Sequence, residues 1–418
     1  MIHKRTKSYP VIASTKCVAI HKKLVFRPCI YYLINMADFF DYLNWRGDLT
    51  FDKVAFNKID ALLFAQISYA LLDGVVPESF TEKKTLPQLA KDFSSLPDYE
   101  ERINIGFLIN NRTTELMIKS SEAERYRKVE VCGFRSIYNE ENVEQFAAMT
   151  FIIDGKPLIA IRGTDDTIIG WKEDFNIAWL EQIPAQKDAL EYFKEAAEAL
   201  EGDFILAGHS KGGNLVINTA VKCGKELQKR VKEVYNFDGP GFNPDFFKLA
   251  EYKAVEDRIQ SFYPGFCVVG MIFHHPKKFE IVQSDGFAFW QHDAMNWQIM
   301  GADFINEGKF ADESRLFNIA FNKWIDKLNL NQRKDFVETM FCILEASGAK
   351  TNNEIEKEAL KATARMVTAY AEMDKGKRKE LKKILSMFKD VITDDIPIFK
   401  PLVLLKNNLR ITGGGSII

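Results

Sequence analysis

The sequence has little cysteine, little histidine and no long uninterrupted apolar run. Its six cysteines are scattered with no Cys-x-x-Cys pair, which argues against a disulfide framework and is typical of reduced thiols in the cytoplasm. No run of about 18 apolar residues occurs, so a membrane-spanning helix is not expected. No cluster of His, Cys and Asp has ligand spacing, so neither a metal nor another cofactor is expected.

The chain also lacks an excess of charge of either sign. Its net charge of -2 gives no electrostatic reason to expect a nucleic-acid partner. The first 35 residues differ, because His3 to Asn35 carries lysines and arginines but no acid. We expect residues 1–35 to be a disordered or dispensable leader, with translation starting naturally at Met36. The alternative is a basic arm that meets anionic lipid or nucleic acid, so peripheral membrane contact stays open.

What the sequence does contain is a change of periodicity along its 418 residues. Helical spacing from Met36 predicts a lead-in over residues 36–127, with helices that include 57–72 and 99–109. Short β-rich runs then alternate with helical segments over 128–300, and Asp154-Gly155 predicts a hairpin between two of these runs. Residues 301–418 are helical again. Alternating strands and helices predict an α/β core with a mainly parallel sheet and helices on both faces.

One motif within this core carries chemistry. Gly208-His209-Ser210-Lys211-Gly212 has the pattern Gly-x-Ser-x-Gly, which alone is weak because roughly one chain in ten of this length contains it by chance. Here an apolar strand over 203–207 precedes it and a helix over 212–223 follows. This setting predicts a nucleophile elbow of the α/β-hydrolase fold, which exposes the Ser210 hydroxyl at the top of the sheet.

A second motif, Arg162-Gly163-Thr164-Asp165, follows an earlier strand. Acyl transfer needs two donors aimed at the oxyanion, one after the nucleophile and one from such a strand–helix loop. The N–H of Lys211 and the N–H and hydroxyl of Thr164 are the candidates. The alternative is that Arg162 and Asp165 only pair across the loop.

Together these motifs resemble those of class 3 (fungal-type) triacylglycerol lipases. From about Met36 to Trp297 the chain resembles more closely a bacterial family of lipase-like α/β-hydrolases, in segments such as 42–48, 236–242 and 291–293. The resemblance implies a Ser–Asp–His mechanism with Thr164 and Lys211 at the oxyanion. The chain departs from the lipases in carrying Lys211 instead of Leu or Met, and in carrying Asp238 where they have glycine. It has no acid after the next strand, over Tyr263 to Gly270.

The base is assigned by elimination among six histidines. His3 and His21 lie in the leader, and His209 belongs to the elbow strand with its side chain expected to point away from Ser210. His292 lies on a late loop, in the serine-first, histidine-last order of this fold. We favour His292, with His275 and then His274 as alternatives.

The orienting acid is less determined. Asp238 ends the strand after the elbow helix and is our first choice, although Asp-Gly-Pro-Gly is also an ordinary turn. Asp285, in a turn before His292, is the second choice. Asp293 is a poorer candidate, because adjacent side chains seldom align for a hydrogen bond to Nδ1.

The sequence therefore predicts a serine hydrolase of carboxylic esters, with a small-molecule or lipid-like ester as its substrate. A non-catalytic binding or scaffold protein of the same fold is one alternative, and an amide or thioester hydrolase is another. The Lys211 side chain has two interpretations. It either lies on the helix surface and pairs with an acid, or favours anionic acyl substrates as a cation beside the elbow. On either interpretation the backbone N–H of Lys211 still serves the oxyanion, so Lys211→Leu is expected to be nearly neutral for a neutral ester.

Overall fold

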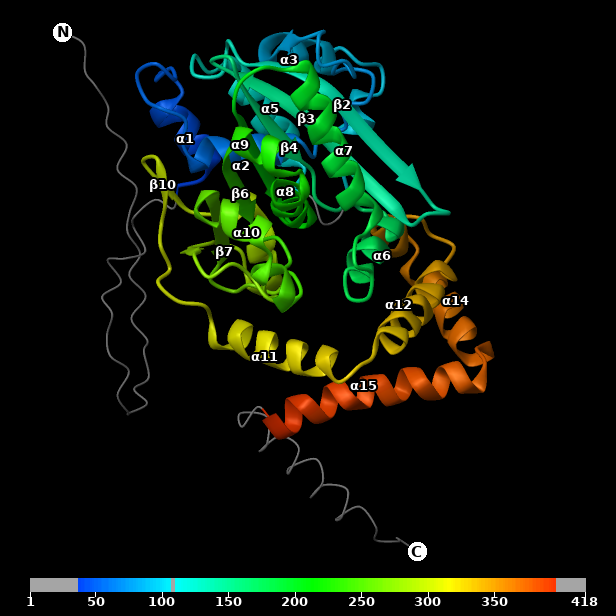
Figure 1. The fold of residues 1–418 in the computed structure, drawn as a ribbon. Coiled ribbons are helices and arrows are strands. Elements are labelled where there is room, and N and C mark those ends of the chain that lie inside the picture. Colours follow the sequence, from blue (N-terminus) through cyan, green and yellow to red (C-terminus); the bar gives the residue numbers. More distant parts are fainter. Residues whose placement is uncertain (1–36, 107–109, 396–418) are drawn as a thin grey trace, which may run out of the picture. The chain divides into compact units, whose positions relative to one another are not determined.

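The computed structural model describes residues 37–106 and 110–395, and the expected basic leader lies outside them. An eight-stranded sheet forms the centre of the described chain (Figure 1). Its strands are β1 (Lys84–Thr85), β2 (Glu130–Asn139), β3 (Glu144–Ile153), β4 (Lys156–Ile161), β5 (Phe204–His209), β6 (Val231–Phe237), β7 (Ile259–Pro264) and β8 (Glu280–Val282). A separate two-stranded sheet pairs β9 (Ile299–Met300) with β10 (Asp303–Phe304).

The strands lie in the sheet in the order in which they occur in the chain. β1 to β4 pair antiparallel, whereas β4 to β8 pair parallel. Asp154 and Gly155, with φ of 47° and 77°, form the predicted hairpin turn between β3 and β4. Parallel neighbours must be joined by crossovers, so the half of the sheet after β4 alternates with helices, as the sequence predicts.

Helices cover both faces of the sheet, which confirms the predicted architecture. Side chains alternate along β5, where Ile205 and Ala207 join one apolar core and Phe204 and Leu206 join the other. The first core is covered by the N-terminal helices α1 (Phe39–Arg46), α2 (Lys58–Ile67), α3 (Leu86–Ser94), α4 (Tyr99–Arg102) and α5 (Arg112–Glu122). The second lies under α7 (Pro184–Ala199), α8 (Lys211–Lys222), α9 (Lys225–Arg230) and α10 (Ala250–Val255), whereas Ile168 of α6 (Ile168–Asn176) belongs to a third core. Figure 1 shows α7 and α8 on the side of the strands opposite α2 and α5.

Two of the predicted N-terminal helices are shorter than expected. α2 ends at Ile67 rather than Leu72, because the Ser68 hydroxyl donates to the Ala65 carbonyl (2.7 Å) and competes with continuation of the helix. α4 ends at Arg102 rather than Ile109, and Gly106, with φ of 116°, takes a backbone conformation that no helix contains.

A buried ion pair fixes the N-terminal helices. Arg125 donates from Nε to Asp60 Oδ1 (2.8 Å) and from Nη2 to Asp60 Oδ2 (2.5 Å), and both side chains are fully buried. The remaining guanidinium donors bond the carbonyls of residues 49, 54 and 55. Tyr42 and Tyr126 also donate to Asp60. A fully satisfied network of this kind holds α1, α2 and the chain after α5 in one arrangement.

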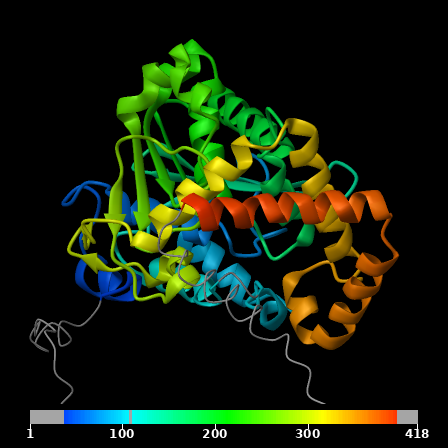
Figure 2. The same ribbon diagram turned by 90° about the horizontal axis from the view of Figure 1, so that it is seen from below.

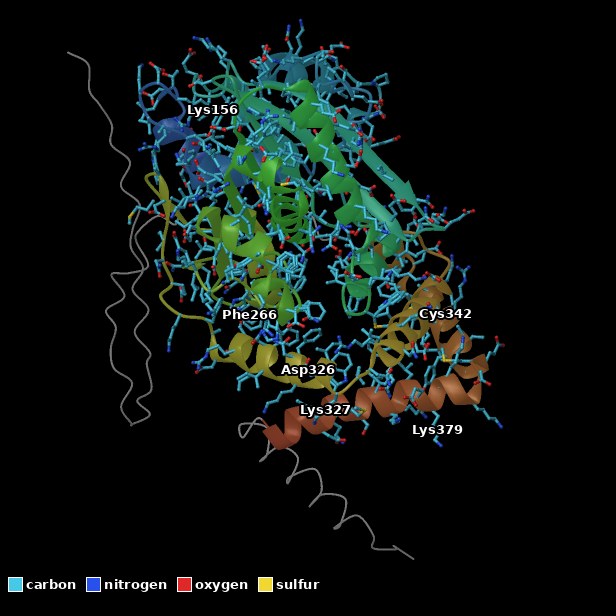
Figure 3. The ribbon with its side chains drawn as sticks, in the orientation of Figure 1. Lys156, Phe266, Asp326, Lys327, Cys342 and Lys379 are labelled. Carbon is cyan, nitrogen blue, oxygen red and sulfur yellow. The ribbon has the colours of Figure 1, made fainter. Side chains whose placement is uncertain are left out.

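The C-terminal part is helical, with α11 (Asp312–Asp326), α12 (Leu330–Glu345), α13 (Asn352–Lys357), α14 (Ala359–Glu372) and α15 (Lys375–Asp395). Figures 1 and 2 show α15 lying alongside α11 and α12. Figure 3 marks Asp326 and Lys327 at the end of α11, Cys342 on α12 and Lys379 on α15. Apolar residues of α11, α12 and α15 form a third core with Ile168 of α6.

Short single-turn helices complete the described chain. They are η2 (Pro244–Lys248), η3 (Glu256–Arg258), η4 (Val269–Met271), η5 (Ala288–His292) and η6 (Ala294–Asn296). Across the described ranges, no helix combines the length and the apolar character that crossing a bilayer requires.

Candidate active site

Ser210 forms the turn between β5 and α8. It has φ of 56° and ψ of -132°, a sparsely populated conformation for a residue with a side chain. The turn needs glycine on both sides: a Cβ on Gly208 would lie 2.2 Å from the Gly212 carbonyl oxygen, and a Cβ on Gly212 would lie 2.1 Å from the Ile161 carbonyl oxygen. The strand, turn and helix predicted around Ser210 are therefore present, and the serine is held at the amino end of α8.

His292 and Asp238 meet beside this turn. His292 Nδ1 lies 2.6 Å from Asp238 Oδ2, and the Asp238 carboxylate is fully buried at the end of β6. An ionised carboxylate only accepts hydrogen bonds, so the pair places the histidine proton on Nδ1 and leaves Nε2 free to accept one. His292 and Ser210 line the same cavity, whereas in the described chain no hydrogen bond joins them.

The other carboxylate candidates have different partners. Asp285 accepts from Gln298 Nε2 (2.8 Å), and Asp293 accepts from Asn110 Nδ2 (2.8 Å) and from the Met295 N–H (3.0 Å). Neither side chain bonds the His292 ring. Of the three acids that the sequence leaves open, the structure brings Asp238 to His292.

Strained backbone conformations, with positive φ at residues other than glycine, also occur elsewhere around the site. The residues other than glycine with positive φ in the described chain are Val143, Asp154, Ser210, Asp238, Phe273 and Ala288. Asp238 (φ 52°) contacts His292, Phe273 (φ 62°) lines the cavity, and Ala288 (φ 51°) opens the turn that ends at His292. Such conformations persist where the surroundings impose them, and they concentrate at functional sites.

His209 is structural, as predicted, but it contributes to the site. Its Nδ1 lies 3.0 Å from the Tyr69 hydroxyl, its Nε2 lies 2.9 Å from the His292 carbonyl oxygen, and its ring contacts the His292 ring at a tilt of 30°, with the ring centroids 4.7 Å apart. Burial lowers the pKa of His209 to about 3, so the ring is neutral. It therefore supports the backbone of His292 rather than taking a proton from Ser210.

The remaining histidines lie elsewhere. His275 packs against Tyr263 and Phe279, and its Nδ1 lies 3.3 Å from the Pro276 carbonyl oxygen. The backbone of His274 pairs with Phe242. Neither lines the cavity that holds Ser210.

The loop after β4 packs directly on the elbow. A Cβ on Gly163 would lie 2.9 Å from Ser210 Cβ, so the loop approaches the serine as closely as a backbone can. The Thr164 hydroxyl donates to Asp174 Oδ2 (2.5 Å), and Arg162 pairs with Asp165 (3.4 Å). Arg162 and Asp165 therefore do pair across the loop, and this pair does not prevent Thr164 from lining the same cavity as Ser210.

Two backbone donors remain available at this point. In the described part of the chain the Thr164 N–H has no acceptor, and the Lys211 N–H is the first of α8, which an α-helix leaves without an internal partner. The Asp174 carboxyl, which accepts from the Thr164 hydroxyl, lies beside these donors, and burial raises its pKa to about 6. Thr164, Lys211 and Ser210 all line one cavity, which is the arrangement that an oxyanion site requires.

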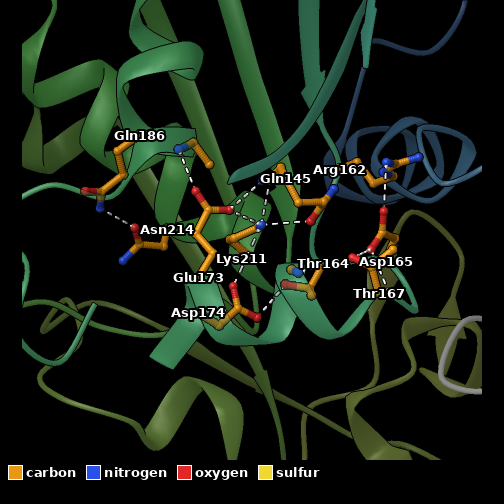
Figure 4. A network of polar contacts seen from close by, with 12 residues as sticks. Gln145, Arg162, Thr164, Asp165, Thr167, Glu173, Asp174, Gln186, Lys211 and Asn214 are labelled. Carbon is orange, nitrogen blue, oxygen red and sulfur yellow. Dashed lines mark hydrogen bonds and ion pairs between the residues drawn. The ribbon is translucent and has the colours of Figure 1, made fainter. Parts of the chain in front are cut away.

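The Lys211 side chain corrects the sequence interpretation. It is fully buried, not on the helix surface, and it does pair with an acid, Glu173, at 2.8 Å. Its Nζ also donates to the Gln145 carbonyl oxygen (2.7 Å) and to Gln145 Oε1 (2.8 Å), and lies 3.9 Å from Asp174 Oδ1 (Figure 4). Because Glu173 compensates this cation, we do not expect Lys211 to favour anionic acyl substrates.

The Glu173 carboxylate explains why a lysine stands where the lipases carry Leu or Met. It is fully buried and accepts the N–H groups of Gln145 and Ala185 in addition to Lys211 Nζ. An unpaired charge there would be costly, and Lys211 compensates it. Replacing Lys211 with an apolar residue is therefore expected to destabilise the protein, whereas its small effect on the turnover of a neutral ester stays a prediction.

One cavity of about 440 Å³ connects these groups. Its polar side chains come from the α/β core and from the N-terminal helical region (Gln66, Tyr69 and Asn110), whereas much of its remaining wall is aromatic or aliphatic. Within the described residues, no three or more His, Cys, Asp or Glu side chains are grouped to hold a metal ion.

Sequence reasoning missed Cys267 and Glu173. The Cys267 thiol donates to Asp238 Oδ1 (2.9 Å), which also accepts the Gly270 N–H (3.1 Å). Burial, and then the Asp238 charge, raise the pKa of the Cys267 thiol well above its usual value, so it stays protonated and remains a donor. No local pattern marks either residue, since each acts through a partner at least 29 positions away along the chain.

Comparison with known proteins gives a family and a structural likeness. Residues 120–342, slightly more than half of the chain, match the model of the Mbeg1-like family. A solved structure of M37 lipase is similar over 51% of this chain and 69% of its own, with 15% identity and a TM-score of 0.33. No curated protein matches the sequence.

Proposed function

The chain belongs to the Mbeg1-like family, a lipase-like family, and from this premise and the site geometry we propose that it is a serine hydrolase of carboxylic esters. Ser210 is the nucleophile, His292 the base and Asp238 the orienting acid. The observation that carries the proposal is the 2.6 Å contact between His292 and Asp238, beside a strained serine on the same cavity.

The mechanism follows from the position of each donor and acceptor. His292 Nε2 takes the Ser210 proton as Oγ attacks the ester carbonyl carbon, and Asp238 stabilises the imidazolium that forms. The N–H groups of Lys211 and Thr164 bind the oxyanion. The tetrahedral intermediate collapses, the C–O bond breaks, and His292 returns the proton to the leaving alcohol. Water then repeats these steps on the acyl-enzyme and releases the acid.

Covalent labelling tests the nucleophile. We expect a fluorophosphonate to add one mass increment to the peptide that contains Ser210, because an activated serine displaces fluoride and an ordinary serine hydroxyl does not. Ser210→Ala should take up no label, and intact-mass spectrometry with peptide mapping reads both results. A folded wild-type protein that stays unlabelled, or is labelled elsewhere, would favour a binding or scaffold role.

Cys267 provides a second test, because we propose that it positions Asp238. Cys267→Val removes one donor from the carboxylate, and we expect kcat/KM to fall about tenfold, a typical cost for a hydrogen bond to a charged group. Removal of this donor should also move the acid limb of the pH–rate profile upward, because a carboxylate with fewer donors attracts the positive charge of the protonated base more strongly. Cys267→Ser keeps a donor and should remain close to wild type. A Val variant with an unchanged pH profile would contradict the role.

We also propose the cytoplasm as the compartment. The cysteines in the described part of the chain are Cys132, Cys223, Cys267 and Cys342, and all four are free thiols. A reducing environment is where such thiols persist.

A further inference from the structure

The cavity at Ser210 has walls from three parts of the chain, and the N-terminal helical region contributes Gln66, Tyr69 and Asn110. Its reactive end is made by Thr164, Ser210 and His292 of the α/β core. The opposite wall comes from the C-terminal helices: Phe317, Phe321 and Trp324 of α11, Phe336 of α12, and Leu385 and Phe388 of α15. Every one of these six side chains is apolar, so a ligand that reaches Ser210 along this wall buries hydrocarbon against it.

The aromatic wall is built around Trp324. Its indole N–H donates to the Ile384 carbonyl (3.1 Å), which satisfies the buried donor and joins α11 to α15. Its ring lies 5.0 Å from that of Phe388 and 5.3 Å from that of Phe336. The three helices therefore share one packed cluster, and Leu385 of α15 lines the cavity outside this cluster with 49% of its surface exposed.

The helices are also fixed to the core. Asn318 of α11 donates to the Met271 carbonyl (2.7 Å), and Arg333 of α12 donates to the Ala178 carbonyl (3.1 Å). The Ile168 N–H, at the start of α6, donates to the Lys350 carbonyl (2.9 Å). These contacts fix α11, α12 and the segment after α12 against the α/β core.

The charges in the cavity exclude an anionic ligand. Lys211 is its one lysine or arginine within the described residues, and Glu173 already compensates that cation. Asp174 and Asp293 line the cavity as well and would repel a phosphate or a carboxylate. The part of the ligand that does not react must therefore be neutral as well as apolar.

From these observations, and resting on the proposed function, we propose that the C-terminal helices form the acyl site and that Leu385 and Phe388 set its length. With about 30 Å³ for each water-sized group, 440 Å³ holds on the order of 15 groups, enough for the ester and a chain of about ten carbons. The family match ends at residue 342, so Leu385 and Phe388 of α15 lie beyond the matched region, whereas the wall residues of α11 and α12 lie within it.

A series of p-nitrophenyl esters from acetate to palmitate, assayed with the full chain, tests the acyl site. For wild type, kcat/KM should rise by up to about fourfold per methylene until the cavity is filled, at about ten carbons, and then level off. Leu385→Trp adds volume and should lower kcat/KM for the decanoate at least tenfold while the butyrate stays within twofold. Phe388→Ala removes a ring and should extend the rise to longer chains.

Ser386→Trp is the matched control, because Ser386 is exposed, neighbours Leu385 on α15 and does not line the cavity. It should leave the length profile unchanged. Thermal unfolding of each variant identifies any loss that comes from misfolding. A Leu385→Trp variant that folds but keeps the wild-type profile, or loses butyrate and decanoate equally, would overturn the proposal.

A binding measurement separates this proposal from the proposed function. Ser210→Ala, which cannot form an acyl-enzyme, should bind methyl decanoate in calorimetry, and Leu385→Trp in that background should weaken the binding at least tenfold. Weakened binding without labelling of Ser210 would support the acyl site and contradict the proposed hydrolase activity. Labelling of Ser210 with binding unaffected by Leu385→Trp would do the reverse.

Discussion

Changing Asp238 to asparagine should lower kcat for p-nitrophenyl butyrate by about 10⁴ with little change in the fold, because only the orienting carboxylate fixes the base in its productive tautomer. Asparagine keeps the shape of the side chain. Its amide nitrogen cannot accept the proton of His292 Nδ1, so an asparagine that turns its NH2 group toward the ring favours the opposite tautomer. Steady-state assays of the purified variant measure the loss.

Asp285→Asn is the matched control for this experiment. Asp285 is the second choice from the sequence, and in the structure it accepts a hydrogen bond from Gln298 instead of His292. Its replacement should leave kcat within about twofold, since the carboxylate is remote from the proton that moves. If Asp285→Asn were the slow variant and Asp238→Asn the active one, the acid would have to be reassigned.

The second large effect concerns stability. Lys211→Met should destabilise the protein by about 3–5 kcal/mol, because it leaves the Glu173 carboxylate buried without its cation. Urea unfolding followed by tryptophan fluorescence gives the change in the free energy of unfolding. The exposed pair of Lys229 with Glu226 offers a comparison, and Lys229→Met should cost no more than about 0.5 kcal/mol.

A double variant tests whether the Lys211 effect comes from the charge. Lys211→Met combined with Glu173→Gln removes both charges, and its cost should fall below the sum of the single variants by about 2 kcal/mol or more. Strictly additive costs would mean that lost packing, and not the uncompensated carboxylate, explains the destabilisation.

The elbow could be predicted from the sequence because its determinants are local. An apolar strand, a serine between glycines and an apolar-faced helix occupy about 20 consecutive residues, and this order alone fixes where the serine lies. The hairpin at Asp154-Gly155 is local in the same way. The ends predicted for the helices that begin near Asn57 and Tyr99 were wrong. The helical spacing of apolar residues continues past Ser68 and Gly106, whereas the helical backbone ends earlier.

The acid, the lysine and the cavity wall depend on contacts between distant segments. Asp238 could be ranked first from its place after a strand, but its contact with His292 spans 54 positions. Lys211 looked like a surface residue because its partner, Glu173, lies 38 positions earlier on another helix. The aromatic residues of α11 and α15 have ordinary helical spacing, and no sequence pattern shows that they face Ser210.

The backbone conformation of Ser210 has a consequence for how this position evolves. A non-glycine residue at φ 56° and ψ -132° costs about 1–3 kcal/mol, and glycine would adopt the same turn without that cost. Stability alone would therefore select glycine between His209 and Lys211. If Ser210 is the proposed nucleophile, its reactivity offsets this cost, and a descendant that no longer needs the reaction has a single-residue path to a more stable, inert protein.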